Sequence, residues 1–407
     1  MVSLFDIQQA AWTIRDRVIR TPLVYSPTFS AMSGASVYLK LETMQRSGSF
    51  KVRGAANKIL SERDRIGPSG VVAASAGNHA QGVALAAAQA GVPATIVMPQ
   101  WVSHSKQQAT KGYGAEVILH GRDLDESLEL AWRLAEEGRT FVHPYNDPAI
   151  VAGQGTIALE VFQDLPHADV FIVPVGGGGL INGIATAAKA LRSKTRIVGV
   201  QAEACPCAYR AKQQGGVVEV EAGQTIAEGI RVRKVGDLNY PALQELVDEV
   251  MLVTEDQIAD AILLLLERKK VLAEGAGAAP LAALLSGDVR IREGESVVLI
   301  VSGGNLDAPL LTRIIRRGMF RSGRIARFHV CLADVPNELA RLLAIVARLD
   351  GNVLHIRHAR GTWDLPLHIS GVELEVETRG FEHIEKLRAA LAESGYAVEV
   401  DSPREVR

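Results

Sequence analysis

Apolar residues in the first three quarters of the chain alternate between two patterns. Short, nearly continuous apolar runs are followed by longer stretches in which apolar residues recur at helical spacing. A run that is apolar at every position is typical of a parallel strand buried on both faces. The clearest predicted strands are residues 70–74, 94–98, 116–119, 170–175, 197–202 and 296–301. From about residue 36 to 303 the chain is therefore predicted to be α/β, with helices covering open sheets.

The pattern changes near residue 327. From there a strand, a helix, two strands, a helix and a last strand can be predicted, and this βαββαβ order is typical of a small ferredoxin-like module. Its first helix places four apolar residues on one stripe: Leu339, Leu342, Leu343 and Val346. Since 407 residues are too many for one hydrophobic core, we predict a large domain over 1–320 and a small domain over 327–407.

Charge and hydropathy exclude several classes of protein. The net charge of −2 provides no long-range field that would attract nucleic acid or an anionic membrane. One local cluster of arginines is interpreted as a solvated helix end: Arg313, Arg316, Arg317, Arg321 and Arg324. The longest apolar stretch is too short to cross a bilayer, and residues 1–20 lack the apolar core of a signal peptide. We expect a cytoplasmic protein.

Three cysteines make neither a disulfide framework nor a metal site. Cys205 and Cys207 are separated by one residue and lack a second ligand pair, and Cys331 stands far away. We interpret them as structural and predict no metal ion.

Lys51 is the first residue with candidate chemistry. A serine-rich turn over residues 47–50 opens a helix that places Lys51 in its first turn, beside Phe50. The positive end of the helix dipole and partial desolvation both favour a neutral lysine, which is the form that attacks an aldehyde. Judged by this segment alone, an exposed structural lysine is the more frequent interpretation.

A glycine loop follows the predicted strand 170–175. Its residues are Gly176, Gly177, Gly178, Gly179 and Leu180, and a helical pattern begins directly after them. Successive glycines let backbone amides approach an anion, and the start of a helix adds partial positive charge. The spacing is neither that of a Walker A loop nor that of a Rossmann motif. A tight turn is the alternative, but we favour a phosphate site.

A third loop joins the strand 70–74 to a helix. Ser75, Ala76, Gly77 and His79 could surround a substrate carboxylate at the free amides of that helix, and Asn78 could form a hydrogen bond with a phenolic oxygen. A simple helix cap is the alternative for the loop, and a packed side chain is the alternative for His79.

Ser302 ends the last strand of the large domain. Its hydroxyl could donate a hydrogen bond to a neutral ring nitrogen, which would leave a pyridine unprotonated and a weaker electron sink. Elimination stays accessible to such a ring, whereas reactions that need a long-lived carbanion are less favoured.

Together and in this order, these segments resemble the fold-type II pyridoxal-phosphate family, most closely the threonine dehydratases and serine racemases. The similarity extends through residues 143–144, 152–156 and 274–277. It implies two open twisted sheets with flanking helices, forming two subdomains within residues 1–320. It also implies pyridoxal 5′-phosphate as cofactor, with Lys51 as its catalytic Schiff-base lysine next to Phe50, Asn78 near the 3′-oxygen, the glycine loop at the phosphate and Ser302 at the ring nitrogen.

The C-terminal module resembles an ACT domain, the amino-acid-sensing unit of many such dehydratases. Residues 334–336 match its first loop, but Asn337 stands where the family has a glycine, and this side chain counts against effector binding. The family resemblance implies an allosteric amino-acid effector and a homo-oligomer, and leaves open the effector's identity and the choice between dimer and tetramer.

Several departures from the family bear on activity. Ala76 replaces the serine with which racemases serve the opposite face of the substrate, so racemisation is disfavoured. Glu203 matches one ligand of the cation site in that branch, but Tyr209 replaces an expected acid. Glu228 replaces a usual aspartate, and no consequence follows from the sequence alone.

The resemblance therefore implies a lyase that converts L-threonine to 2-oxobutanoate and ammonia, as in isoleucine biosynthesis, with L-serine as a further candidate substrate. The alternatives are a serine dehydratase or racemase and, from another class, a non-catalytic amino-acid sensor.

Overall fold

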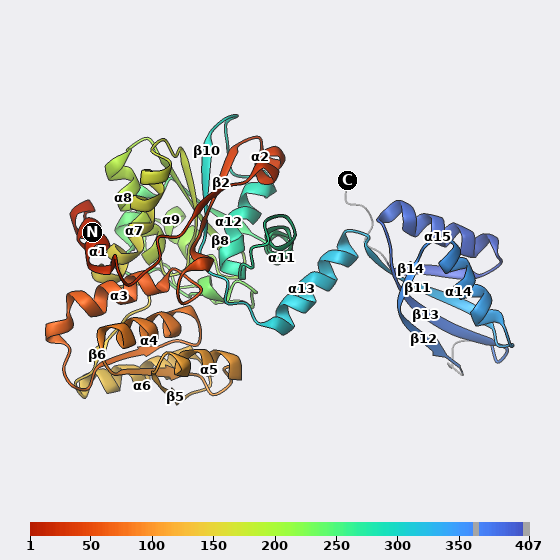
Figure 1. Ribbon diagram of the computed structural model, residues 1–407, viewed down its shortest axis with the longest axis horizontal. Coiled ribbons are helices and arrows are strands. Elements are labelled where there is room, and N and C mark those ends of the chain that lie inside the picture. The colour runs from red at the N-terminus through yellow and green to blue at the C-terminus, as the bar shows by residue number, and fades with distance from the viewer. Residues whose placement is uncertain (361–365, 402–407) are drawn as a thin grey trace. The chain divides into compact units, whose positions relative to one another are not determined.

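The computed structural model describes residues 1–360 and 366–401, which fall into two compact units, Met1–Leu306 and Asp307–Arg407 (Figure 1). The division lies ahead of helix α13 (Ala308–Arg321), whereas the sequence-based boundary kept residues up to 320 in the first domain. α13 belongs to the second unit because it packs on that unit's sheet, where Arg316 forms an ion pair with Glu375 (2.6 Å). In the described parts of the chain, no helix is long and apolar enough to cross a membrane.

The first unit contains two sheets. The larger has the strand order β1-β2-β10-β7-β8-β9, with β1 antiparallel to β2 and the other neighbours parallel. Its strands are β1 (Leu23–Tyr25), β2 (Ser36–Leu41), β7 (Val170–Pro174), β8 (Arg196–Ala202), β9 (Glu249–Val253) and β10 (Ser296–Val301). The smaller sheet is entirely parallel, in the order β5-β4-β3-β6. Its strands are β3 (Val71–Ala74), β4 (Ala94–Met98), β5 (Glu116–Leu119) and β6 (Thr140–Phe141).

Each predicted strand is present, with ends that differ by one residue at most, and the α/β class is confirmed. β1, β2, β6 and β9 were not identified from the pattern. β6 has only two residues, and β2 carries the charged residue Lys40, which is nevertheless fully buried. A buried charge interrupts the apolar run by which a strand is recognised, and its burial depends on partners that are distant in the sequence.

Helices flank both sheets. Around the larger sheet lie α1 (Leu4–Ile14), α2 (Pro27–Ser33), α7 (Pro148–Asp164), α8 (Gly179–Leu191), α9 (Cys207–Gln214), α10 (Tyr240–Leu246), α11 (Glu255–Leu264) and α12 (Gly275–Ser286). With the smaller sheet go α3 (Lys51–Ser61), α4 (Asn78–Ala90), α5 (His104–Gly112) and α6 (Leu124–Glu136). Four short turns are η1 (Glu42–Met44), η2 (Arg63–Arg65), η3 (Glu228–Ile230) and η4 (Leu265–Lys269). We call these two parts the large and small subdomains.

α3 lies at the junction of the two subdomains. It packs on α4 of the small subdomain and on α7 of the large one (Figure 1). Separate apolar cores lie around the two sheets. The loops that follow β3, β7 and β10 begin at Ser75, Val175 and Ser302, at the carboxyl ends of parallel strands where α/β proteins bind their ligands. The fold therefore places three of the predicted site loops at the carboxyl ends of parallel strands and Lys51 at the start of α3, in the junction.

The second unit confirms the predicted βαββαβ order. Its elements after α13 are β11 (Ile325–Ala333), α14 (Glu338–Arg348), β12 (Asn352–Ala359), β13 (Ile369–Glu377), α15 (Phe381–Glu393) and β14 (Ala397–Asp401). The sheet is antiparallel in the order β12-β13-β11-β14, and both α14 and α15 contribute to one apolar core. Leu342 and Val346 are buried in that core, with Leu339 and Leu343 packed against it, as the predicted stripe requires. Asn337 has a left-handed φ of 78°, the backbone geometry that a glycine would also adopt there.

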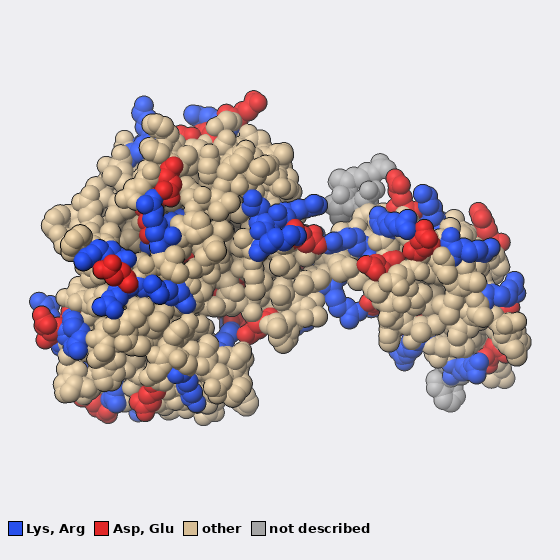
Figure 2. All heavy atoms as spheres, in the orientation of Figure 1, with Lys and Arg blue, Asp and Glu red and all other residues tan. Residues whose placement is uncertain are grey.

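Acidic and basic side chains are interspersed on the face shown in Figure 2, consistent with the small net charge. Within the predicted arginine cluster, Arg316 forms the ion pair with Glu375 described above, so at least part of that cluster serves the packing of the second unit.

Candidate active site

Lys51 is the first residue of α3 and is half-buried. Its Nζ donates a hydrogen bond to the Pro144 carbonyl oxygen (2.8 Å) and lies 5.3 Å from the centre of the Phe50 ring. Burial lowers the pKa of Lys51 to about 8, and the carboxylate of Glu274 opposes this shift. A substantial fraction of Lys51 is therefore neutral near physiological pH, as a nucleophilic amine must be.

The loop that precedes Lys51 is bound to the Ser302 loop by backbone contacts. The Phe50 amide donates to the Ser302 carbonyl (3.0 Å), and Ser49 forms a bridge with Gly303. Ser302 itself is 2% exposed. Residues from opposite ends of the first unit's sequence thus form one wall of the site.

Asn78 begins α4, directly after the Ser75–Gly77 loop. Its Nδ2 donates to Glu274 Oε1 (2.6 Å), and its Oδ1 accepts a hydrogen bond from Asn305 Nδ2 (2.6 Å). A Cβ placed on Gly77 would meet no atom within 4 Å, so the loop borders open space. The first amides of α4 have no carbonyl one turn earlier to which they could donate, and they remain available for a carboxylate.

Tyr145 packs against the glycine loop, and Asn239 forms a hydrogen bond with it. A Cβ on Gly177 would lie 2.3 Å from the Tyr145 ring, and one on Gly179 would lie 2.8 Å from the Tyr145 carbonyl oxygen. Asn239 Nδ2 donates to the carbonyl oxygens of Gly177 (2.9 Å) and Tyr145 (3.0 Å). Gly178 has a φ of 93° and caps α8, whose first amides lack intrahelical acceptors. Close packing explains the glycines, and the free amides form a cradle for an anion.

His79 is a packed residue, the alternative given above. It is 3% exposed, its Nε2 lies 2.8 Å from the Val142 carbonyl oxygen, and burial lowers its pKa to about 3. The neighbouring His143 accepts hydrogen bonds at Nδ1 from the amides of Tyr145 and Asn146, and burial lowers its pKa to about 4. Both rings are neutral at pH 7. A part for His79 in substrate binding stays a prediction that could rest only on its backbone amide.

Glu274 is a site residue that sequence reasoning missed, although it was part of a matching segment. It caps α12, is 9% exposed and donates its amide to the Gly303 carbonyl (3.0 Å). Burial raises the pKa of Glu274 to about 7, against the hydrogen bond from Asn78. The available signal was an acidic residue directly before the apolar run 275–285. Asn305, Asn239 and Tyr145 were missed because only their spatial neighbours reveal them.

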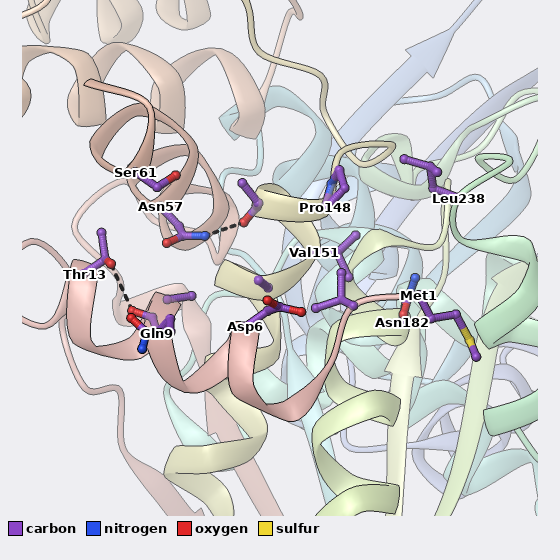
Figure 3. Close-up of a pocket in the computed structure, with 14 residues that line it drawn as sticks. Met1, Asp6, Gln9, Thr13, Asn57, Ser61, Pro148, Val151, Asn182 and Leu238 are labelled. Carbon is purple, nitrogen blue, oxygen red and sulfur yellow. Dashed lines mark hydrogen bonds between the residues drawn. The ribbon is translucent and has the colours of Figure 1, made fainter. Parts of the chain in front are cut away.

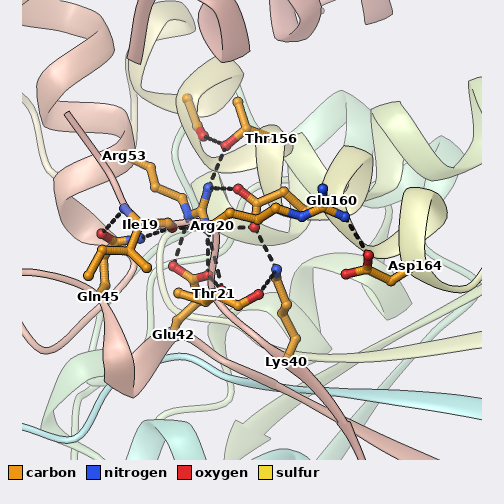
Figure 4. A network of polar contacts seen from close by, with 11 residues as sticks. Ile19, Arg20, Thr21, Lys40, Glu42, Gln45, Arg53, Thr156, Glu160 and Asp164 are labelled. Atoms are coloured by element: carbon orange, nitrogen blue, oxygen red, sulfur yellow. Dashed lines mark hydrogen bonds and ion pairs between the residues drawn. The ribbon is translucent and has the colours of Figure 1, made fainter. Parts of the chain in front are cut away.

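A buried network of charges holds α3 in place (Figure 4). Arg53, two residues after Lys51 and fully buried, pairs with Glu42 (2.8 Å) and with Glu160 of α7 (2.6 Å). Lys40 of β2, also fully buried, pairs with Glu160 (2.5 Å). Burial alone would raise the pKa of Glu42, but the Arg53 guanidinium holds this pKa below its usual range. Two cations balance two anions, and the helix that carries Lys51 is tied to both β2 and α7.

A separate cavity of about 460 Å³ opens at the junction of the two subdomains (Figure 3). Residues of α1, α3, α7 and α8 line it, and none of the predicted site residues does. Asn182, in its wall, donates to Asn239 Oδ1 (2.9 Å), so the cavity is linked through Asn239 to the glycine loop.

The family described as "Pyridoxal-phosphate dependent enzyme" matches residues 14–303. The chain belongs to the pyridoxal-phosphate-dependent enzymes. An L-threonine ammonia-lyase of Thermotoga maritima is 47% identical over 404 residues, which are 98% of this chain and 100% of that protein. The structure of maize serine racemase has a TM-score of 0.74 and 36% identity, covering 78% of this chain and 98% of the racemase. The structure of a tomato (Solanum lycopersicum) threonine deaminase, isoform 2 in its processed form, has a TM-score of 0.73 and 35% identity, covering 77% and 92%. The resemblance stated from the sequence, the fold class and the cofactor are confirmed.

The residues present fit pyridoxal phosphate. Lys51 offers an amine with a lowered pKa, α8 begins with free amides at a glycine cradle, and Asn78 retains a second N–H on Nδ2. Short contacts join these groups: Lys51 Nζ bonds the Pro144 carbonyl oxygen, the Tyr145 ring packs on Gly177, and Gly303 lies beside the Asn78 side chain. The site has the donors that an aldehyde, a phosphate and a phenolic oxygen require.

Proposed function

We propose that this pyridoxal-phosphate enzyme is an L-threonine ammonia-lyase, which forms 2-oxobutanoate and ammonia, and that L-serine is a second substrate. The observation that carries the proposal is the buried amine of Lys51, whose pKa is lowered to about 8, among loops that offer an anion cradle and a ring clamp. The similarity to the Thermotoga protein over nearly the whole of both chains supports threonine as the substrate.

Five groups would hold the cofactor and the substrate. Lys51 Nζ would bond the cofactor's aldehyde carbon, with Phe50 beside it, and the amides of residues 176–180 would bind the phosphate. Ser302 would donate to the ring nitrogen and Asn78 to the 3′-oxygen. The free amides at the start of α4, which include those of Asn78 and His79, would bind the substrate carboxylate beside Ser75, Ala76 and Gly77. When bound, the cofactor withdraws electrons from the Cα of the amino acid, so that its Cα proton becomes removable.

With cofactor and substrate bound, Lys51 would act as the general base at Cα, because its lowered pKa leaves part of the amine neutral. The β-hydroxyl leaves as water after it gains a proton. Glu274 carries an exchangeable proton near pH 7 on the side of Asn78 and is our candidate for this proton donor, with the cofactor phosphate as the alternative. The released enamine tautomerises to an imine, and hydrolysis of this imine consumes one water and gives the 2-oxo acid and ammonia. Ala76 has no proton to give to the opposite face of Cα, which favours elimination over racemisation.

Substitution of Lys51 tests the scheme. Lys51→Ala should abolish 2-oxobutanoate formation and change the visible spectrum of the bound cofactor. Lys111→Ala, which removes an exposed lysine on α5, should leave both unchanged. Full activity in Lys51→Ala would refute the assignment. A chiral assay of serine incubated with the wild-type enzyme separates the rival activity, since appreciable D-serine would show a racemase.

For the second unit we propose an ACT-type regulatory domain that binds an amino-acid effector. The βαββαβ order and the left-handed backbone at Asn337 support it, because that residue takes the conformation of the glycine usual in the ligand loop. We also propose a cytoplasmic homo-oligomer, in line with the family. Threonine kinetics with and without branched-chain amino acids, together with light scattering, would test the effector and the assembly.

A further inference from the structure

The segment 216–239 joins α9 to α10 and lies over several parts of the site. We call it the strap. Its Gly236 amide donates to the Gly177 carbonyl (3.0 Å), which fixes it to the glycine loop. A Cβ on Gly229 would lie 3.3 Å from Glu274 Oε1, and one on Gly176 would lie 3.2 Å from the Cα of Ile230. The strap therefore borders both the anion cradle and Glu274.

Ion pairs join the strap to the small subdomain. Lys106, in the first turn of α5, pairs with Glu228, the first residue of η3 (2.8 Å). The Lys106 side chain is 19% exposed, and that of Glu228 is 65% exposed. Arg233 of the strap pairs with Asp125 of α6 at 3.4 Å, with both side chains more than half exposed. Lys106 is the better-buried cation of the two, and its pair lies nearer to Glu274 along the strap.

We propose that the ion pair Lys106–Glu228 is a latch that holds the strap across the two subdomains and places opposite charges beside Glu274. Both are positioning residues, and the inference rests on the proposed function, in which Glu274 exchanges a proton near pH 7.

The charges around Glu274 act in opposite directions. Burial raises its pKa, and the Glu228 carboxylate raises it further. The Asn78 hydrogen bond and the cations Lys106 and Lys51 lower it. The two charges of the latch thus act on the pKa of Glu274 in opposite directions, and the loss of either one removes only its own contribution.

Glu228 replaces the aspartate that is usual in the family, and the longer side chain is what allows the ion pair with Lys106. An aspartate at this position, the residue usual in the family, has one methylene fewer and would fall short by about 1.5 Å from the same backbone. From the present 2.8 Å the contact with Lys106 would open to roughly 4 Å or more, beyond a direct ion pair. Glu228→Asp therefore keeps the charge and loses the contact, whereas Glu228→Gln keeps the length and loses the charge.

Four variants separate the latch from simple structural support: Lys106→Met, Glu228→Gln, Glu228→Asp and, as a matched control, Arg233→Gln. Infrared difference spectra, with Glu274→Gln as the blank, would follow the Glu274 carboxyl of the holoenzyme during a pH titration. We expect Lys106→Met to move the midpoint up and Glu228→Gln to move it down, each by roughly half a pH unit to one unit. The double variant should return close to the wild-type midpoint, and Arg233→Gln should leave it in place.

Two further measurements separate the effect of the Lys106–Glu228 contact from the effect of the Glu228 charge. They are hydrogen exchange of residues 225–236 and steady-state kinetics with threonine. Glu228→Asp should raise exchange in the strap and raise KM for threonine roughly two- to fivefold, with a smaller change in the Glu274 midpoint than in Glu228→Gln. Midpoints that move in the same direction in Lys106→Met and Glu228→Gln, or not at all, would overturn the inference. The titration and the exchange need no turnover, so a wild-type enzyme that made no 2-oxobutanoate would refute the proposed function and leave these two results standing.

Discussion

Replacing Arg53 with methionine should cost the first unit about 3–5 kcal/mol of its free energy of unfolding. Arg53 is fully buried and is the cation that both Glu42 and Glu160 contact (Figure 4). Methionine fills much of the same volume but leaves Glu42, which is also fully buried, without its charged partner. Removal of one member of a buried pair is costly because the remaining charge has lost its solvation and gained nothing in return.

Thermal unfolding of the holoenzyme measures this effect. At about 2 °C per kcal/mol for a unit of this size, Arg53→Met should lower Tm by about 6–10 °C. The matched control is Arg20→Met, since Arg20 pairs with Asp164 at the edge of the same network but has a side chain 53% exposed. A surface pair contributes about 0–1 kcal/mol, so the control should shift Tm by about 2 °C or less.

The pH dependence gives a second measure with a defined sign. In the wild type the pKa of Glu42 lies below its usual value of 4.5, so this carboxylate adds stability above that pH and loses it as the pH falls. Without Arg53, burial would instead raise the pKa of Glu42, and stability would fall as the pH rises. The difference between the two proteins should be widest above about pH 5 and should narrow on acidification. Equal losses in Arg53→Met and Arg20→Met, or a difference independent of pH, would refute this account of the network.

Four further outcomes are expected. Glu274→Gln should lower kcat about a hundredfold and remove the ionisation near pH 7 from the kcat profile, as loss of a general acid does, and an unchanged profile would exclude that role. Since the pKa of Glu274 is raised to about 7, wild-type stability should fall as the pH rises from 4.5 to 7, and calorimetry of the glutamine variant should show this fall removed. Gly177→Ala places a Cβ 2.3 Å from the Tyr145 ring and should weaken cofactor binding in a fluorescence titration. Gly112→Ala is the control, because a Cβ there meets nothing within 4 Å, and it should bind the cofactor as the wild type does. Equal affinities of the two variants would contradict the phosphate cradle. Dialysis against EDTA should leave kcat for threonine unchanged, and a loss restored by a divalent cation would show that a site near Glu203 is retained.

Much of the fold could be predicted from the sequence, because buried parallel strands and amphipathic helices have short-range signatures. The βαββαβ order of the second unit was confirmed element by element, and the strands 94–98, 116–119 and 296–301 have the predicted ends. The glycine loop and the Asn78 loop were identified for a related reason: each lies between a predicted strand and the start of a helix, so its place at a strand end follows from local order alone. Lys51 was identified from the serine-rich turn that opens its helix.

The tertiary structure decided which charges are buried and what each one contacts. Nothing local distinguishes Lys40 and Arg53 from surface cations, and their burial depends on Glu42 and Glu160, which neighbouring elements bring to them. Glu274 likewise acquires a pKa of about 7 only because α12 buries it next to Asn78, 196 residues away in the sequence. Local patterns in the chain were enough to predict most of the elements and the family. The protonation of the site depends on desolvation and on long-range pairing, which exist only in the folded chain.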